Sequence, residues 1–185
     1  MKTLEDQMAF YAAYHQDARN KLSHFIGVPA IIFGLFIALG WLRVEIGGVT
    51  LTAAMLLAAV VMVWYFVLDV PLALAMLVVN GALITLADMV AVQPLTVGAI
   101  WFLVFFGGGW VIQLIGHVYE GRKPALVDNF FQVFVAPIFL AAEVFFALGY
   151  KPQLHAAVQK RALAMRAAAG VVENRPLVSS DGHSA

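Results

Sequence analysis

Hydrophobic residues along this chain gather into long runs that are separated by short polar joins. Four of these runs have nearly the ~20 apolar residues that a helix needs to cross ~30 Å of hydrocarbon; they cover residues 25–42, 51–68, 72–92 and 95–115. The joins hold residues that favour turns, such as Gly47-Gly48, Asp69-Val70-Pro71 and Gln93-Pro94. The pattern predicts an all-α fold, a polytopic membrane helical bundle with four full spans.

A fifth apolar segment, residues 127–149, is interrupted by Ala136-Pro137, which we expect to break the helix. Two topologies stay open for it. If the segment crosses the membrane, the Lys and Arg residues divide five against six between the two sides; if it re-enters and returns at Pro137, they divide ten against one. The positive-inside bias favours the second arrangement. In the fourth run, Gly107-Gly108-Gly109 is expected to bend or weaken the helix.

Amphipathic helices are predicted on both flanks of the apolar runs. Residues 3–18 place apolar side chains at spacings of three and four, and Asn20 to Ser23 then form a polar join. Residues 152–169 are amphipathic and basic, which suits a helix lying on a membrane surface. The Ser-, Asp- and Gly-rich tail 171–185 is predicted to be disordered. We therefore expect a single integral membrane catalytic domain over residues 1–170.

Composition supports a membrane protein and excludes several other classes. Of the 185 residues 63% are hydrophobic and 12% are charged, whereas soluble domains are usually about 45–50% apolar. The net charge of zero gives no basic face for a nucleic-acid partner. The chain has no cysteine, so disulfides and thiolate metal sites are excluded. The polar N-terminus is not a secretory signal. We expect the bacterial inner membrane or the endoplasmic reticulum, according to the source; the oligomeric state stays open.

The polar residues of the chain concentrate between Gln113 and Asn129, directly after the fourth apolar run. If the helix continues through Glu120, then Gln113, His117 and Glu120 share one face. Polar groups at the mouth of an apolar bundle cost free energy unless they are paired or solvated. This cluster is therefore expected to have a structural or functional role.

Three histidines are predicted to meet at one membrane face. His15 and His24 precede the first span and His117 ends the fourth, and an even number of crossings returns the chain to the side on which it started. Three imidazoles can hold Fe, Zn or Cu, and Glu120 could complete an open site. On one straight helix His15 and His24 would lie about 180° apart, so the helix must bend near Asn20. In the alternative interpretation, each histidine is an ordinary interfacial residue.

Other polar residues allow a structural or a functional interpretation. Asp128, Gln132 and Glu143 are predicted to share one face with Phe139. There they either form interhelical hydrogen bonds, or orient the metal ligands or bind a substrate carboxylate. Arg122 and Lys123 suit lipid headgroups, and Asn80 and Asp88 suit contacts between helices. Nucleotide, hydrolase and metalloprotease motifs are absent, and five histidines are too few for the His-box di-iron hydroxylases. Any metal site should be mononuclear.

Two motifs resemble those of an integral membrane family once known only as a domain of unknown function. The first runs Phe10-Tyr11-Ala-Ala-Tyr14-His15-x4-Asn20-x3-His24-x2-Gly27-Val28-Pro29. The second runs Gly116-His117-x2-Glu120-x-Arg122-x-Pro124-Ala125-Leu126-x-Asp128-Asn129, followed by Gln132, Ala136-Pro137 and Glu143. The likeness covers about residues 3–155. The characterised fungal members are iron(II)-dependent 2-hydroxy fatty acid dioxygenases of the endoplasmic reticulum, which act in the α-oxidation branch of phytosphingosine breakdown.

The resemblance implies that this chain uses Fe(2+) and O2 to convert a long-chain 2-hydroxy fatty acid into the acid one carbon shorter and CO2. His15, His24 and His117 match the family's functional histidines and would bind the metal. Glu120, Arg122, Asp128 and Asn129 are the candidate catalytic residues. A further histidine of the fungal proteins is replaced by Gln16, which leaves the ligand set open. The alternative function is a non-enzymatic small membrane transporter or lipid-binding scaffold.

Overall fold

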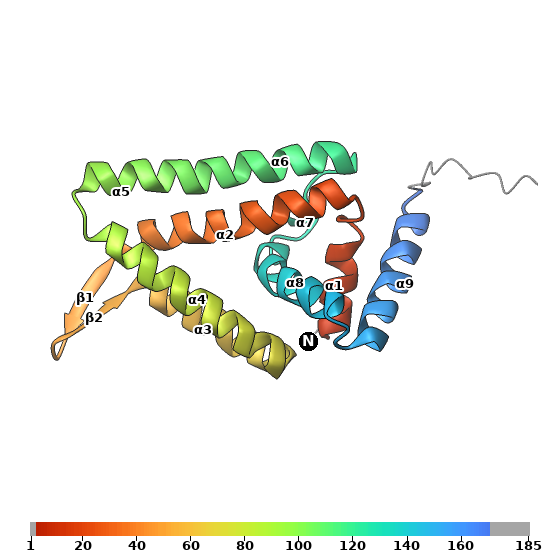
Figure 1. The fold of residues 1–185 in the computed structure, drawn as a ribbon, viewed down its shortest axis with the longest axis horizontal. Helices are drawn as coiled ribbons and strands as arrows, with labels where there is room; N and C mark the ends of the chain where they lie inside the picture. The colour runs from red at the N-terminus through yellow and green to blue at the C-terminus, as the bar shows by residue number, and fades with distance from the viewer. Residues whose placement is uncertain (1–2, 171–185) are drawn as a thin grey trace, which may run out of the picture.

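The computed structural model describes residues 3–170, and this part of the chain is mostly helical (Figure 1). The helices are α1 Leu4–Ala12, α2 Ala18–Gly40, α3 Ala53–Leu68, α4 Val70–Ala91, α5 Leu95–Phe102, the π-helical η1 Leu103–Gly107, α6 Gly108–Glu120, α7 Ala125–Asp128, α8 Gln132–Ala147 and α9 Pro152–Ala168. A two-stranded antiparallel sheet is formed by β1 Arg43–Ile46 and β2 Val49–Thr52. The predicted helical class is therefore confirmed, with a small sheet added.

The centre of the fold is α2, which lies beside the continuous helix formed by α5, η1 and α6 (Figure 1). Glycines let the two backbones approach closely. A Cβ atom added at Gly34 would lie 2.6 Å from the backbone nitrogen of Phe106, and one added at Gly116 would lie 1.9 Å from Ser23 Oγ. Side chains of α2 and α6 can therefore meet directly at the end of the helix pair where Gly116 lies.

The hairpin of α3 and α4 packs against α2 on another side. Asp69 ends α3 and caps α4, because its Oδ1 accepts a hydrogen bond of 3.1 Å from the backbone N–H of Leu72. Its other carboxylate oxygen pairs with Lys151 at the start of α9. One carboxylate therefore ties the turn of the hairpin to the C-terminal helix.

The helices α1, α8 and α9 gather at one end of α2, with α1 in contact with both α8 and α9 (Figure 1). They bury the largest apolar cluster among the described residues, which includes Met8, Tyr65, Phe139 and Val158. This cluster fixes where α1 lies relative to α2, and so it fixes the segment that joins them.

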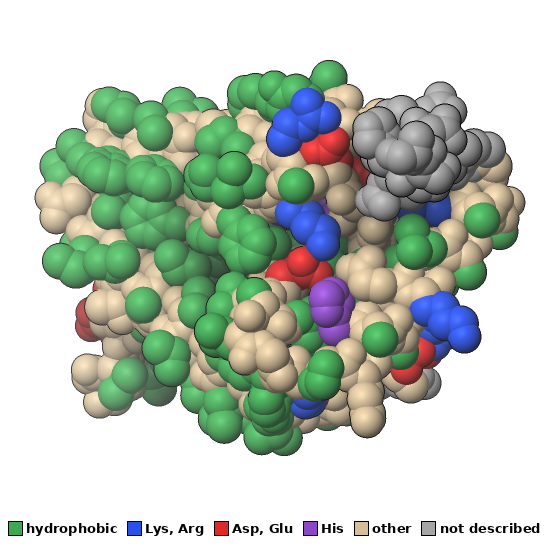
Figure 2. All heavy atoms as spheres, turned by 45° about the vertical axis from the view of Figure 1, so that its right-hand side comes forward, with side chains coloured by type: hydrophobic (Ala, Val, Ile, Leu, Met, Phe, Trp, Pro, Cys, Tyr) green, Lys and Arg blue, Asp and Glu red, His purple; other side chains and the backbone are tan. Residues whose placement is uncertain are grey.

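Three helical stretches in the described part of the chain are long and apolar enough to cross a membrane: Ala18–Gly40, Val70–Ala91 and Leu95–Glu120. The helices α3 and α8 are apolar but have only 16 residues each, so four full spans are not confirmed. Apolar side chains cover one half of the face in Figure 2, whereas charged side chains gather towards the other half. This division is consistent with a membrane protein.

Residues 43–52 differ from the predicted join at Gly47-Gly48 and the predicted start of the second apolar run at residue 51. They form the β-hairpin, with the turn at Gly47 (φ 60°) and Gly48 (φ 82°), and α3 begins only at Ala53. Two consecutive glycines in the left-handed region favour a tight hairpin turn, in agreement with the turn signal but not with the expected helix.

The predicted helix boundaries near the two ends also need correction. The helix predicted over residues 3–18 ends at Ala12, and Asn20 and Ser23 lie inside α2 rather than in a polar join. The expected break at Ala136-Pro137 is wrong, because α8 continues through Pro137. Pro137 lies past the first turn of α8 and removes one backbone hydrogen bond. Its neighbours Val135, Ala136 and Ile138 are buried, and this packing favours a continuous helix.

Three further predictions concern the glycine triplet, the basic helix over residues 152–169 and the C-terminal tail. The glycine triplet begins with Gly107, the last residue of the π-helical η1, as expected for a site that disturbs a helix. The basic helix predicted over 152–169 is α9, whose Val158 and Ala162 are buried in contact with the rest of the fold. The predicted disordered tail lies outside the described residues.

Candidate metal centre

The three predicted histidines converge on one buried point. His15 lies between α1 and α2, His24 lies near the start of α2, and His117 lies in the last turn of α6. Their side chains are 2%, 2% and 6% exposed. One ring nitrogen of each lies within 4.8 Å of those of the other two. The predicted meeting of all three imidazoles is therefore confirmed.

The bend that brings His15 to His24 lies slightly before the predicted position at Asn20. Helix α1 ends at Ala12, and α2 begins after Asp17, whose side chain accepts a hydrogen bond of 2.8 Å from the N–H of Arg19. The Arg19 guanidinium bonded to this carboxyl lowers the pKa of Asp17 to about 2, so the cap stays charged. A charged N-cap stabilises the new helix start and places the bend at residues 13–17.

Hydrogen bonds fix which ring nitrogen of His15 and of His24 is free. His15 Nδ1 lies 2.7 Å from the carbonyl of Tyr11, and His24 Nδ1 lies 2.8 Å from the carbonyl of Asn20. A carbonyl only accepts, so each Nδ1 carries the proton and each Nε2 presents a lone pair. The two Nε2 atoms face each other at 3.2 Å. Two lone pairs at this distance repel unless a cation lies beside them, so these residues fit a metal ion.

The surroundings of His15 favour a neutral ring. Burial holds the pKa of His15 well below its ordinary value, and the ring stacks on Tyr11 with centroids 4.0 Å apart. A neutral imidazole is the form that binds a metal. Tyr11 of α1 stands four residues before His15, and on the helix predicted over residues 3–18 this spacing brings two side chains together. That spacing is the signal by which Tyr11 could have been included among the site residues.

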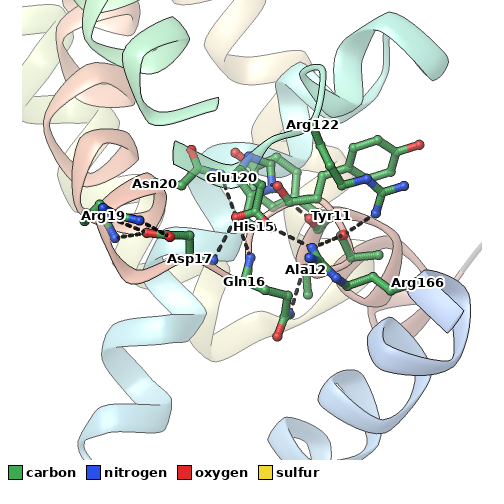
Figure 3. A network of polar contacts seen from close by, with 12 residues as sticks. Tyr11, Ala12, His15, Gln16, Asp17, Arg19, Asn20, Glu120, Arg122 and Arg166 are labelled. Carbon is green, nitrogen blue, oxygen red and sulfur yellow. Dashed lines mark hydrogen bonds and ion pairs between the residues drawn. The ribbon is translucent and has the colours of Figure 1, made fainter. Parts of the chain in front are cut away.

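Glu120 is buried beside the histidines, but its oxygens are directed to other partners (Figure 3). Its Oε2 accepts hydrogen bonds from the backbone N–H groups of Gln16 and Asp17, at 2.9 and 2.7 Å. These two residues belong to the bend that follows His15. Glu120 therefore holds the segment that carries a ligand, which is the kind of support that orients metal ligands from outside.

Of the other three predicted catalytic residues, two contact the segment that carries His15. Arg122 donates a hydrogen bond of 2.8 Å to the carbonyl of Ala13 and lies over the ring of Tyr14. Asp128 accepts a hydrogen bond of 2.6 Å from the Tyr14 hydroxyl and pairs with Lys123. The Lys123 ammonium and the Tyr14 hydroxyl both lower the pKa of Asp128. Asn129 is half-buried, and its Oδ1 accepts a hydrogen bond from the backbone N–H of Phe131.

The predicted common face of Asp128, Gln132, Phe139 and Glu143 is wrong for its first member. Asp128 ends α7, and a turn at residues 129–131 separates it from α8. Glu143 pairs with Lys21 of α2 at 2.8 Å, in agreement with an interhelical role. Asp88 likewise pairs with Arg43, and Asn80 donates to Met62 Sδ. These polar residues hold elements together, as the structural interpretation expects.

An apolar cavity of about 320 Å³ opens directly onto the three histidines. This volume lies within the range of small-molecule sites. Gln113, on the predicted face of His117, lines it. The other lining residues come from several helices: Tyr11, Val28, Ile31, Ile32, Leu35, Phe36, Leu57, Ala58, Val61, Tyr65, Asn80, Phe106, Trp110, Pro124, Ala125, Leu126, Phe130, Gln132, Val133, Phe134, Ala136 and Pro137. The arrangement joins three nitrogen ligands to a cavity suited to a hydrocarbon chain.

Comparison with known proteins identifies the family. The family model described as 2-hydroxy-palmitic acid dioxygenase Mpo1-like matches residues 1–148. The 2-hydroxy-palmitic acid dioxygenase MPO1 of Saccharomyces cerevisiae is 35% identical over 163 residues, which cover 84% of this chain and 87% of the yeast protein. No solved structure matches the chain. The two matches agree with each other over most of the sequence, and the chain belongs to the Mpo1-like family of 2-hydroxy-palmitic acid dioxygenases.

Proposed function

We propose that this protein is an iron(II)-dependent dioxygenase that shortens long-chain 2-hydroxy fatty acids by one carbon. The observation that supports the proposal most directly is the buried cluster of His15, His24 and His117 at the mouth of an apolar cavity. The yeast relative is named for 2-hydroxy-palmitic acid, a substrate with a polar head and a long apolar tail. The histidine cluster suits the polar head of such a molecule, and the apolar cavity suits its tail.

The proposed reaction balances without a co-reductant. A 2-hydroxy acid and O2 give the acid one carbon shorter, CO2 and water, so the bond between the carboxyl carbon and the 2-carbon is broken. Both atoms of O2 are used, and no flavin or nicotinamide site is needed. Iron bound by the three histidines would supply the Lewis acid and the template that bring the 2-hydroxy acid and O2 together.

The residues of the chain would bind the substrate, keep the metal-binding nitrogens oriented and shield the reacting carbons from water. His15 and His24 are held by their Nδ1 hydrogen bonds, so their Nε2 atoms keep a fixed direction. The apolar walls contributed by α2, α3, α6 and α8 would enclose the acyl tail and keep water from the reacting carbons. A substrate that already resides in a bilayer would reach such a site without crossing bulk water.

The test is turnover by the purified protein. Metal-free protein in detergent is mixed with 2-hydroxypalmitic acid in air, with and without added iron(II), and O2 uptake, CO2 and pentadecanoic acid are measured. We expect equal amounts of the three only with iron(II), and none with palmitic acid, which lacks the 2-hydroxyl. Absence of turnover for every chain length, with iron bound at one equivalent, would contradict the proposal.

The transporter alternative would need a polar path, for which Asn80, Asp88 and Glu143 are the candidate residues. Two of these residues are paired with cations of neighbouring elements, so the structure gives this alternative no specific support. Iron content also separates the two functions, because a transporter needs no stoichiometric iron.

A further inference from the structure

We propose that Arg166 of α9 is a positioning residue of the metal centre, because it neutralises the buried Glu120 carboxylate that shapes the segment carrying His15. The inference rests on the proposed metal-binding role of the three histidines. It assigns to the C-terminal helix, which lies beyond the residues 1–148 matched by the family model, a part in the geometry of the site.

The Glu120 carboxylate is a junction between three parts of the chain (Figure 3). Its side chain is 1% exposed. Besides the N–H groups of Gln16 and Asp17, Oε2 accepts a hydrogen bond of 3.2 Å from Asn20 Nδ2. Its Oε1 pairs with Arg166 at 2.6 Å. The bend, the first turn of α2 and helix α9 therefore meet at one carboxylate.

A carboxylate this deeply buried requires a cation. The free energy cost of taking an ionised carboxylate out of water is large unless it is paired and hydrogen-bonded, and breaking such a pair leaves an uncompensated charge. Arg166 supplies the charge, and its side chain is itself only 12% exposed. The same guanidinium nitrogen donates to the carbonyl of Ala13 at 3.1 Å. Arg166 therefore contacts both the carboxylate and the start of the bend that it holds.

Helix α9 is anchored so that Arg166 reaches this position. Val158 and Ala162 are fully buried, and α9 packs against α1. At the outer edge of the same contact, Arg161 pairs with Glu5 and Asp6 of α1 at 2.9 and 2.7 Å. Arg161 thus offers a matched control, because it also joins α9 to α1 through carboxylates but touches neither Glu120 nor the bend.

Loss of Arg166 should act on the ligand geometry through Glu120. Without the cation, the carboxylate is left as an uncompensated buried charge and is expected to move towards water, which weakens its hydrogen bonds to Gln16 and Asp17. The segment around His15 would then lose the constraint that keeps the Nε2 atoms of His15 and His24 at 3.2 Å. Removal of a group that orients metal ligands typically lowers metal affinity or activity by roughly 10–100-fold.

The experiment measures cobalt(II) binding to the full-length protein in detergent, by the visible absorption of the bound ion. We expect Arg166→Met to weaken cobalt(II) affinity by about 10–100-fold and to change the shape of the absorption bands, which report ligand geometry. Arg166→Lys keeps the charge and should restore part of the affinity. Arg161→Met should match the unchanged protein in both respects.

A double variant makes the test independent of general folding defects. Once Glu120→Gln has removed the buried charge, adding Arg166→Met should weaken binding far less than it does alone. Unchanged affinity and bands in Arg166→Met, equal losses in Arg161→Met, or fully additive losses in the double variant would each overturn the inference. Failure of the unchanged protein to bind cobalt(II) or iron(II) would instead overturn the proposed metal centre, so the two failures are distinguishable.

Discussion

At the scale of single residues, the site contains two kinds of side chain. Some can bind a metal, and others hold these metal-binding side chains in place. His15 and His24 each use Nδ1 for a backbone carbonyl, which leaves Nε2 free. Glu120 uses both carboxylate oxygens for other partners. The candidate roles of Arg122, Asp128 and Asn129 stay predictions; the first two contact the segment that carries His15, and none of the three lines the cavity.

This separation predicts different effects of two substitutions on iron content. His117→Ala removes a ligand and should abolish iron binding. Glu120→Gln keeps an oxygen that can accept from the N–H groups of Gln16 and Asp17, so at saturating iron(II) it should lower activity more than occupancy. Iron per protein, measured in the two variants side by side, checks the prediction. Equal loss of iron would mean that Glu120 binds the metal directly.

At the scale of elements, contact between α2 and the α5–η1–α6 helix determines where His24 meets His117. This contact depends on glycines at which a Cβ atom would clash with backbone. Close approach is needed because imidazoles are short, and helices separated by large side chains would hold the two rings too far apart. The helix pair is therefore as much a part of the site as the histidines are.

A matched pair of glycine substitutions tests this contact. At Gly34 an added Cβ would lie 2.6 Å from the backbone nitrogen of Phe106, so Gly34→Ala should destabilise the protein by about 1–3 kcal/mol. At Gly81 of α4 nothing lies within 4 Å, so Gly81→Ala should be neutral or stabilise by up to about 1 kcal/mol. Thermal unfolding in detergent measures both. Similar losses of stability in the two variants would argue against close packing of α2 on η1.

At the scale of the whole molecule, the cavity extends along α2 from His24 to Phe36, about 18 Å at the rise of an α-helix. Phe36 and Ala58 of α3 belong to one buried cluster at the far end. Because the head of the substrate would lie at the histidines, the tail would point to this cluster. No single element forms the cavity, so its length is a property of the assembled fold.

Filling the far end should shorten the preferred substrate without affecting the metal. Ala58 is buried and lines the cavity, so Ala58→Phe would occupy space that the end of a long acyl chain needs. We expect a higher KM for 2-hydroxypalmitic acid, a smaller change for 2-hydroxy acids with shorter chains, and unchanged iron content. A uniform loss of activity across chain lengths would indicate that the tail lies elsewhere.

The sequence by itself determined the helical class, the long apolar runs, the three histidines and the need for a bend between His15 and His24. These features depend on local physics: apolar run length, helical periodicity and the rarity of polar groups next to apolar runs. The match to the family confirms the resemblance carried by the two motifs. The prediction from local sequence was wrong at Pro137. Proline tends to break a helix, but α8 includes Pro137 without a break.

Only the tertiary structure decided what the other polar residues do. Glu120 and Arg166 are 46 positions apart, and nothing in either local pattern indicates that they pair. Asp128 lost its predicted place on α8 because the chain turns at residues 129–131. The cavity is likewise invisible in the sequence, since its walls come from several helices whose separation is set by glycine contacts and by burial. Whether two side chains pair, and whether several helices enclose a cavity, depends on the distances between segments that are far apart in the sequence. Those distances are set only when the chain folds.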